Sequence, residues 1–288
     1  MQGTGYGKAI LIGEHFVVHG ARGIGIGIPR NTTVRLRKAA GLVFAFECGD
    51  MLKYATRKIL EMTVSNTYFE VYVESELPHS AGMGWSASYC VALARAAAKA
   101  AGRELSNREA AEIAFEGEKV FHGNPSGIDN TMAAFGGAML FKKKCQPKPL
   151  AIKNRLHFVI ANSGKKKPTK DLVEKVLRIK EKRPAEFRRM MAAEERIVDG
   201  AIKALAKGDE RKLGRLMNKN NALLEKLGLS TRNIEEIRET ALENGALGAK
   251  ITGAGGGGCV LILAPDSQRA KKIAKKLKYW DAFVFNVD

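Results

Sequence analysis

The sequence predicts an α+β protein of two domains. Strand-like and helix-like segments alternate along its 288 residues, with hairpin-like pieces between them, and such alternation is typical of mixed folds. A basic stretch, residues 142–154, contains two prolines and shows no helical period, which places a domain boundary near residue 150. We therefore expect an N-terminal domain over residues 1–150 and a C-terminal domain over residues 151–288.

The first half reads as strands followed by two helices. Apolar runs bounded by turn residues predict strands over residues 8–13, 33–37, 42–47, 69–75 and 136–141. An alanine-rich stretch, residues 86–101, predicts a helix that ends before Gly102. Ser106 and Glu109 have the spacing of a capping box, which predicts a second helix that begins there and ends near residue 121.

The second half opens with a strand, residues 156–162, and continues mainly as helices. Pro184 and Gly208 separate three helical stretches, and Asn244 with Gly245 ends a fourth. The expected helices span residues 170–182, 185–206, 209–226, 232–244 and 266–278. A glycine-rich segment, residues 249–263, precedes the last helix, and residues 282–287 form a final strand.

Composition and charge limit the classes of function. Hydrophobic residues make up 45% of the chain, enough for a real core, and no apolar run has the length of a membrane-spanning helix. We see no signal peptide, and four cysteines without a CxxC pair favour a reducing cytoplasm over a disulfide framework or a zinc site. The net charge of +18 attracts polyanions, so a nucleoside triphosphate and nucleic acid are both candidate partners.

The segment PHSAGMGWSAS, residues 78–88, is the first of three candidate functional sites. Gly82 and Gly84 let the backbone turn before the alanine-rich helix, whose N-terminal amide groups suit a phosphate group. Ser86 adds a hydroxyl that suits Mg²⁺. A glycine turn with Ser86 as a simple N-cap explains the segment equally well. Neither a P-loop nor a Rossmann pattern is present in a fitting context.

Two further segments carry candidate chemical groups. In residues 115–137, Asp129 ends the segment HGNPSGID, which is rich in residues that favour turns. Glu118 lies eleven residues earlier, on the preceding helix. These two carboxylates suit a shared site, with one on a metal ion and one near a substrate. In residues 7–20, Lys8, Glu14 and His15 flank a strand. Taken one at a time, each of these five residues is as readily a surface group or a satisfied core group.

Taken together, the three segments resemble the three signature motifs of the GHMP kinase superfamily, in order and in spacing. GKAILIGEHFVVHG, GEKVFHGNPSGIDN and AKITGAGGGGCVLIL resemble most closely the motifs of the mevalonate kinase family. The resemblance implies an N-terminal domain like domain 2 of ribosomal protein S5 and a ferredoxin-like C-terminal domain, with the active site in the cleft between them. It implies transfer of the γ-phosphoryl group of ATP to the primary hydroxyl of (R)-mevalonate, with Mg²⁺ as cofactor.

The resemblance also implies roles for individual residues. Asp129 falls on the catalytic aspartate and Lys8 on the catalytic lysine, whereas Ser86 and Glu118 fall on the Mg²⁺ ligands. The residues expected to bind ATP are Pro78, Ala81, Gly82, Met83, Gly84, Trp85, Ser86, Ala87 and Ser88. The residues expected to face the substrate are Glu14, His15, Thr252, Gly253, Ala254 and Gly255.

Four positions depart from the family's usual motifs. Ser80 replaces a glycine and Met83 a leucine in the second motif, and Trp85 stands where the first of two serines is usual. Tyr6 replaces a proline in the first motif. We expect the Trp85 backbone amide to contact phosphate while its ring turns away into packing.

Other functions stay open from sequence alone. A GHMP kinase acting on phosphomevalonate, homoserine or a sugar is the nearest alternative. A nucleic-acid-binding protein is a more distant one, because no aromatic platform or nucleic-acid motif accompanies the lysine clusters. We expect small-molecule substrates and no membrane partner, and the sequence leaves the oligomeric state open, a homodimer included.

Overall fold

The computed structural model describes residues 1–64, 68–77, 82–123, 125–143, 145–164 and 168–288. The chain forms two compact units: unit 1 comprises Met1–Lys8 and Gly27–Gly136, and unit 2 comprises Ala9–Ile26 and Gly137–Asp288. Strands β1 (Gln2–Ile12) and β2 (Arg22–Ala39) contribute residues to both units. The division between residues 150 and 151 stays a prediction. In the described part of the chain, no helix is both long enough and apolar enough to cross a membrane.

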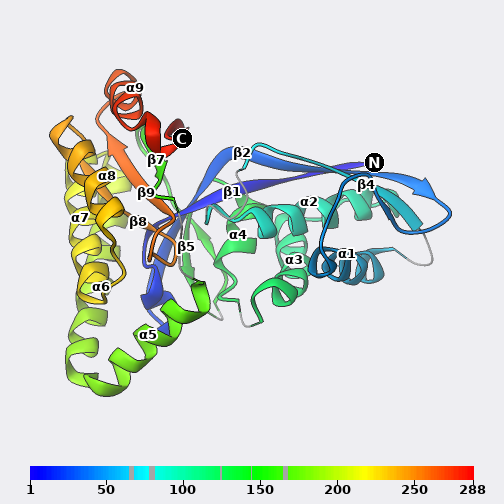
Figure 1. Cartoon of the computed structure of the whole chain (residues 1–288), viewed down its shortest axis with the longest axis horizontal. Helices are drawn as coiled ribbons and strands as arrows, with labels where there is room; N and C mark the ends of the chain where they lie inside the picture. Colours follow the sequence, from blue (N-terminus) through cyan, green and yellow to red (C-terminus); the bar gives the residue numbers. More distant parts are fainter. Residues whose placement is uncertain (65–67, 78–81, 124, 144, 165–167) are drawn as a thin grey trace. The chain divides into compact units, whose positions relative to one another are not determined.

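Unit 1 is a small sheet covered by helices. Besides its parts of β1 and β2, it contains β3 (Val43–Phe44), α1 (Asp50–Thr63), β4 (Tyr68–Ser75), α2 (Trp85–Ala100), α3 (Asn107–His122) and α4 (Ile128–Phe135). Strand β4 pairs antiparallel with residues 32–39 of β2 and parallel with β3. Figure 1 shows α2 alongside α3, and α2 also packs against α1 and α4.

Helix α2 is central to unit 1 because its small side chains permit close packing. All but one of its residues from Ala87 to Ala98 are buried. Gly3 and Gly5 of β1 lie against it: a Cβ atom on Gly5 would lie 3.0 Å from Ser88 Cα, and one on Gly3 would lie 2.5 Å from Ala96 N. Glycines at these two positions therefore let the strand approach the helix.

Unit 2 is built around a four-stranded antiparallel sheet in the order β10-β7-β9-β8. Its strands are β7 (Leu156–Asn162), β8 (Gly248–Thr252), β9 (Cys259–Ala264) and β10 (Phe283–Val287). Its helices are α5 (Thr169–Lys182), α6 (Pro184–Lys207), α7 (Glu210–Lys226), α8 (Arg232–Glu243) and α9 (Ser267–Lys276), with the short turns η1 (His15–His19) and η2 (Lys278–Trp280). Strands β8 and β9 are buried at every position, because helices α7 and α8 pack on them. Strands β5 (Ala138–Lys142) and β6 (Lys148–Pro149) pair with each other, and β5 pairs with residues 22–26 of β2.

The α+β prediction is confirmed, and each predicted helix begins and ends within two residues of its expected bounds. The capping box is present, since Ser106 Oγ accepts from Glu109 N and the Glu109 carboxylate accepts from Ser106 N. Other expectations were incomplete. Helix α1 was not predicted, α4 occupies part of the stretch expected to be turns, and β3 has two residues where six were expected.

Candidate active site

The candidate site in unit 1 begins with a buried lysine on β1. Lys8 is 4% exposed, and its Nζ lies 3.1 Å from Asp129 Oδ1. Asp129 lies in the first turn of α4, where the amide groups of a helix N-terminus favour a carboxylate. The Lys8 amide also donates to Met83 O at 3.0 Å, so β1 is bonded to the glycine turn that precedes α2.

That glycine turn fits closely around Lys8. Gly84 has φ +75°, a left-handed conformation that favours glycine, and it is the N-cap residue of α2. A Cβ atom on Gly84 would lie 2.8 Å from Lys8 Cγ. In the described part of the chain no side chain caps α2, so its first amide groups suit an anion.

Ser86 and Glu118 come together at the start of α2 and the end of α3. Ser86 Oγ lies 3.4 Å from His122 Nε2, and that nitrogen lies 3.7 Å from Glu118 Oε2. Burial, and then the nearby charge of Asp129, raise the pKa of Glu118 to about 7, whereas a hydrogen bond from Ser86 and the charge of Lys8 act the other way. Ser86, Glu118, Asp129 and Lys8 therefore form one electrostatic group.

The Glu118 carboxylate suits a metal ion. Its Oε1 is buried and has no hydrogen-bond partner among the described residues, which is costly for a carboxylate oxygen. In the described part of the chain no three His, Cys, Asp or Glu side chains form a group that could hold a metal ion, so a metal here would need other ligands as well, such as the Ser86 hydroxyl. Oxygen ligands completed by phosphate and water suit Mg²⁺.

The rest of the predicted ATP segment divides into groups that face the turn and groups that pack inward. Trp85 stacks on Tyr89, with ring centroids 5.6 Å apart and planes 9° apart, and packs against the core of unit 1. Ser88 is fully buried: its hydroxyl donates to Gly5 O at 2.7 Å and accepts from Thr32 N at 3.2 Å. Ala87 and Met83 are buried, and Gly82 lies in the turn. Pro78 and Ala81, and with them Ser80, lie outside the described residues.

Tyr6, the other departure from the family motifs, also has a structural explanation within unit 1. Gly136 has φ +63°, and a Cβ atom there would lie 3.0 Å from the Tyr6 ring. The bare glycine leaves room for the tyrosine ring in place of the usual proline.

The predicted substrate residues gather within unit 2. His15 is buried and its Nε2 donates to Ala254 O at 2.8 Å, which fixes a proton on that nitrogen; burial lowers the His15 pKa, and this backbone bond partly opposes the shift. Thr252 Oγ1 accepts from Ile10 N at 2.8 Å. Glu14 is also buried and forms an ion pair with Lys250 on β8.

The glycine-rich loop after β8 is shaped by a close backbone contact. Gly256 N donates to Leu229 O at 2.7 Å, and a Cβ atom on Gly255, which has φ +75°, would lie 2.7 Å from the same oxygen. Gly253 likewise has positive φ. The run of glycines thus lets this loop lie against the segment before α8.

Two residues near these groups were not among the predicted site residues. His122 contacts both Ser86 and Glu118, and Lys250 pairs with Glu14. His122 stands in the quoted HGNPSGID segment and Lys250 in AKITGAGGGG, so both lie inside recognised motifs. A lone histidine or lysine carries no sign of its partner when that partner is distant in sequence.

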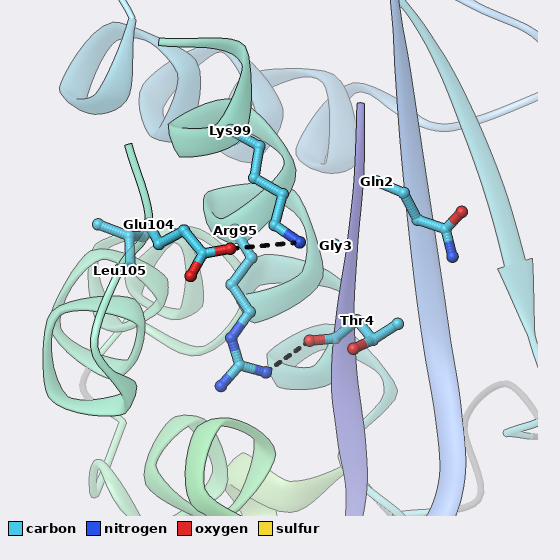
Figure 2. A pocket seen from close by; sticks show the side chains of 7 residues that line it. All are labelled: Gln2, Gly3, Thr4, Arg95, Lys99, Glu104 and Leu105. Atoms are coloured by element: carbon cyan, nitrogen blue, oxygen red, sulfur yellow. Dashed lines mark hydrogen bonds and ion pairs between the residues drawn. The ribbon is translucent and has the colours of Figure 1, made fainter. Parts of the chain in front are cut away.

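A pocket of about 330 Å³ in unit 1 is separate from these groups. It is lined by Gln2, Gly3, Thr4, Arg95, Lys99, Glu104 and Leu105. Figure 2 shows Arg95 donating to Thr4 O, at 2.7 Å, and Lys99 paired with Glu104, at 4.0 Å. Arg95 also donates to Asn107 and Ala134. Its guanidinium is already bound by the protein, and no predicted site residue lines this pocket.

Comparison with known proteins identifies the family. Residues 50–137 match the family model of the GHMP kinases N terminal domain, and residues 201–281 match that of the GHMP kinases C terminal. A mevalonate kinase of Pyrococcus horikoshii is 35% identical, over 94% of this chain and 90% of that protein.

Solved structures agree with the sequence comparison. The L. major mevalonate kinase in complex with R-mevalonate is 34% identical, with a TM-score of 0.92, over 100% of this chain and 96% of that chain. The Methanococcus jannaschii mevalonate kinase is 28% identical, with a TM-score of 0.84, over 99% and 97% of the two chains. With both domains matched and relatives above 30% identity along nearly its whole length, this chain belongs to the GHMP kinases, and among them to the mevalonate kinases.

Proposed function

We propose that this chain transfers the γ-phosphoryl group of ATP to the primary hydroxyl of (R)-mevalonate, giving 5-phosphomevalonate and ADP. The observation that carries the proposal is the Lys8–Asp129 pair beside Ser86 and Glu118, at the uncapped N-terminus of α2. Membership of the mevalonate kinases, and a relative bound to R-mevalonate, support mevalonate as the acceptor.

Asp129 is the proposed catalytic residue, and its role is to orient the acceptor hydroxyl. A carboxylate is far too weak a base to deprotonate a primary alcohol beforehand. Phosphoryl transfer has a loose transition state, so the proton leaves late, when the oxygen is already partly bonded to phosphorus. Asp129, one-third exposed, accepts it at that point.

Lys8 is the proposed source of positive charge for the transferring group. Its ammonium pairs with Asp129 and the tight turn at Gly84 lies against its aliphatic stem, so little reorganisation is needed when negative charge develops. The amide groups at the start of α2 bind the ATP phosphates in this proposal.

Ser86 and Glu118 are the proposed Mg²⁺ ligands. Bound there, Mg²⁺ would neutralise charge on the β- and γ-phosphates. His122 contacts both ligands and so orients them. The buried Glu118 Oε1, which has no hydrogen-bond partner among the described residues, is the feature that supports this assignment.

The substrate-facing residues are proposed to be His15 and the loop of residues 252–255, all in unit 2, whereas Glu14 is buried in its pair with Lys250 and is proposed to support them. His15 Nε2 is occupied by Ala254, so the other ring nitrogen is the one available to a substrate. A cytoplasmic location is part of the same proposal, since the substrates are small and charged.

Purified protein tests the proposal directly. With ATP and Mg²⁺, ADP release is measured with (R)-mevalonate, phosphomevalonate, homoserine and galactose in parallel, and the product is identified by mass spectrometry and ³¹P NMR. We expect a kcat/KM for mevalonate at least 100-fold above that for every other acceptor. Preference for another acceptor would assign the chain to a different GHMP kinase activity, and ADP release without any acceptor dependence would contradict the proposal.

A further inference from the structure

Among the described residues of unit 2, three charged side chains are almost completely removed from solvent. Glu14, Glu194 and Lys250 are 2%, 0% and 0% exposed. They come from three separate places in the chain: the turn after β1, the middle of α6, and strand β8. Burying charge is costly unless each group is paired and hydrogen-bonded, so the contacts of this cluster indicate its role.

Lys250 bonds the end of β1 to β8. Its Nζ donates to Glu14 Oε1, to Ile251 O, and to Ile10 O at 3.3 Å. An ammonium group has three protons, so all three are used. Ile10 and Glu14 belong to the first motif, residues 7–20, whereas Ile251 belongs to the third, residues 249–263.

Glu194 completes the cluster from α6. Asn220 on α7 donates to both of its carboxylate oxygens, at 2.8 and 2.9 Å. Burial, followed by the charge of Glu14, raises the pKa of Glu194 to about 7, while Asn220 and Lys250 oppose the shift. Burial lowers the pKa of Lys250, and Glu14 and Glu194 oppose that shift, while the more distant Arg238 adds to it. Helix α6 therefore adds a second acid to the Lys250–Glu14 pair, and α7 supplies the amide that binds this acid.

The hydrogen bonds continue from this cluster to the proposed substrate residues. His15, next to Glu14, bonds to Ala254 O, and Thr252, two residues after Lys250, bonds to Ile10. The first and third motifs are thus joined at three successive points. Of the three residues of the third motif that make these contacts, Lys250, Thr252 and Ala254, Lys250 carries the charge.

We propose that Lys250, supported by Glu194, is a positioning residue that fixes the first motif against the third, so that His15 and the glycine-rich loop are held ready for the acceptor. The inference rests on the proposed function for its kinetic readout. Lys250 itself is fully buried and acts through Glu14 and Ile10.

Two variants test the role. Lys250→Met removes the ammonium and leaves Glu14 buried without its cation, so it is expected to fold poorly. The double variant Glu14→Gln/Lys250→Met removes both charges and is expected to fold. In the double variant we expect the KM for mevalonate to rise at least tenfold, while the KM for ATP stays within twofold of wild type. Ile273→Ala, in the buried face of α9, is the control for general loss of stability.

The control separates positioning from stability. Ile273→Ala is expected to lower the melting temperature and leave both KM values within twofold. A folded double variant with an unchanged KM for mevalonate, or a control with the same KM rise, would overturn the proposal.

Hydrogen–deuterium exchange gives a readout that does not depend on substrate. In the double variant we expect amides in residues 10–20 and 250–258 to exchange at least tenfold faster, with residues 267–276 unchanged. If wild-type protein does not phosphorylate mevalonate but this exchange pattern holds, the proposed function fails and the positioning role stands. Unchanged exchange in the two segments would overturn the positioning role whatever the activity.

Discussion

Lys8 and Asp129 form an ion pair in which the cation is buried and the carboxylate is not: the side chains are 5% and 33% exposed, with 3.1 Å between Lys8 Nζ and Asp129 Oδ1. The lysine is fixed by β1 and the turn at Gly84, whereas the aspartate keeps an open side. This difference in exposure agrees with the proposed roles, in which Lys8 supplies a fixed positive charge and Asp129 contacts the hydroxyl of the acceptor.

The first prediction concerns Asp129. Asp129→Ala is expected to lower kcat by far more than tenfold, because the acceptor loses its orienting group and proton acceptor. ATP affinity, measured by calorimetry, is expected to change less than threefold, since the proposed phosphate contacts come from α2. A variant that kept more than about a tenth of wild-type kcat, a loss of about 1.4 kcal/mol at most, would refute the assigned role.

The second prediction uses two glycines with the same backbone conformation. Gly84 and Gly102 precede and follow α2 with φ +75° and +74°. An alanine at either position costs on the order of 1 kcal/mol in backbone strain. At Gly84 the new methyl also meets Lys8, whereas at Gly102 nothing lies within 4 Å.

We therefore expect Gly84→Ala to lower kcat at least 30-fold, with Gly102→Ala within twofold of wild type at a comparable unfolding midpoint. Kinetics and urea denaturation of both variants measure this. Equal kcat values for the two would show that the Gly84 turn does not position Lys8.

The third prediction addresses the metal. Ser86→Ala is expected to raise the Mg²⁺ concentration needed for half-maximal activity at least fivefold, and excess EDTA is expected to abolish activity until Mg²⁺ is restored. Ser88→Ala is the matched control: it is expected to lower stability by about 1–2 kcal/mol through its lost bonds to Gly5 and Thr32, with the Mg²⁺ titration unchanged. An unaltered titration in Ser86→Ala would move the metal site elsewhere.

The fourth prediction concerns Trp85. Its ring packs on Tyr89 and the core of unit 1, and the proposed phosphate contact is its backbone amide. Trp85→Ser is therefore expected to keep kcat and the KM for ATP within threefold, while the free energy of unfolding falls by about 2–4 kcal/mol. A tenfold gain in ATP affinity would instead mean that the indole crowds the nucleotide.

Much of the fold could be predicted because its helices carry local signals, such as the Ser106 capping box and Gly208 after α6. Helix α1 was missed although its buried residues recur at helical spacing, since it begins after Gly49 with no capping side chain. The start of β1 was missed because Gly3 and Gly5 have poor strand propensity, and only the close approach of α2 explains them.

Site residues that lie inside a motif could be predicted from the sequence. Contacts between residues far apart in the sequence could be predicted less well. Lys8 and Asp129 were expected together, and they are paired. The Glu14–Lys250 contact joins residues 236 positions apart, and Glu194 belongs to none of the three motifs. Such groups come together only in the folded chain, so no local sequence pattern predicts their contact.

The last prediction is the pH dependence of stability caused by Glu194. Its pKa is about 7 in the folded protein, raised above the ordinary 4.5 first by burial. Between these two pH values the folded protein keeps a proton that the unfolded chain has released, so stability falls as pH rises, by about 3 kcal/mol at most. Glu118 contributes a slope of the same sign, so comparison with a variant is needed to isolate Glu194.

The side chain introduced by Glu194→Gln is neutral at every pH, so this variant is expected to lose the part of the pH dependence of stability that Glu194 causes. Urea denaturation at pH 5 and pH 8 is expected to show a smaller stability difference in Glu194→Gln than in wild type, whereas Glu243→Gln, at an exposed position, is expected to behave as wild type. Equal pH dependence in wild type and Glu194→Gln would mean that Glu194 is charged in the folded protein over this whole pH range. The ammonium of Lys250 would then neutralise two buried carboxylates, those of Glu14 and Glu194.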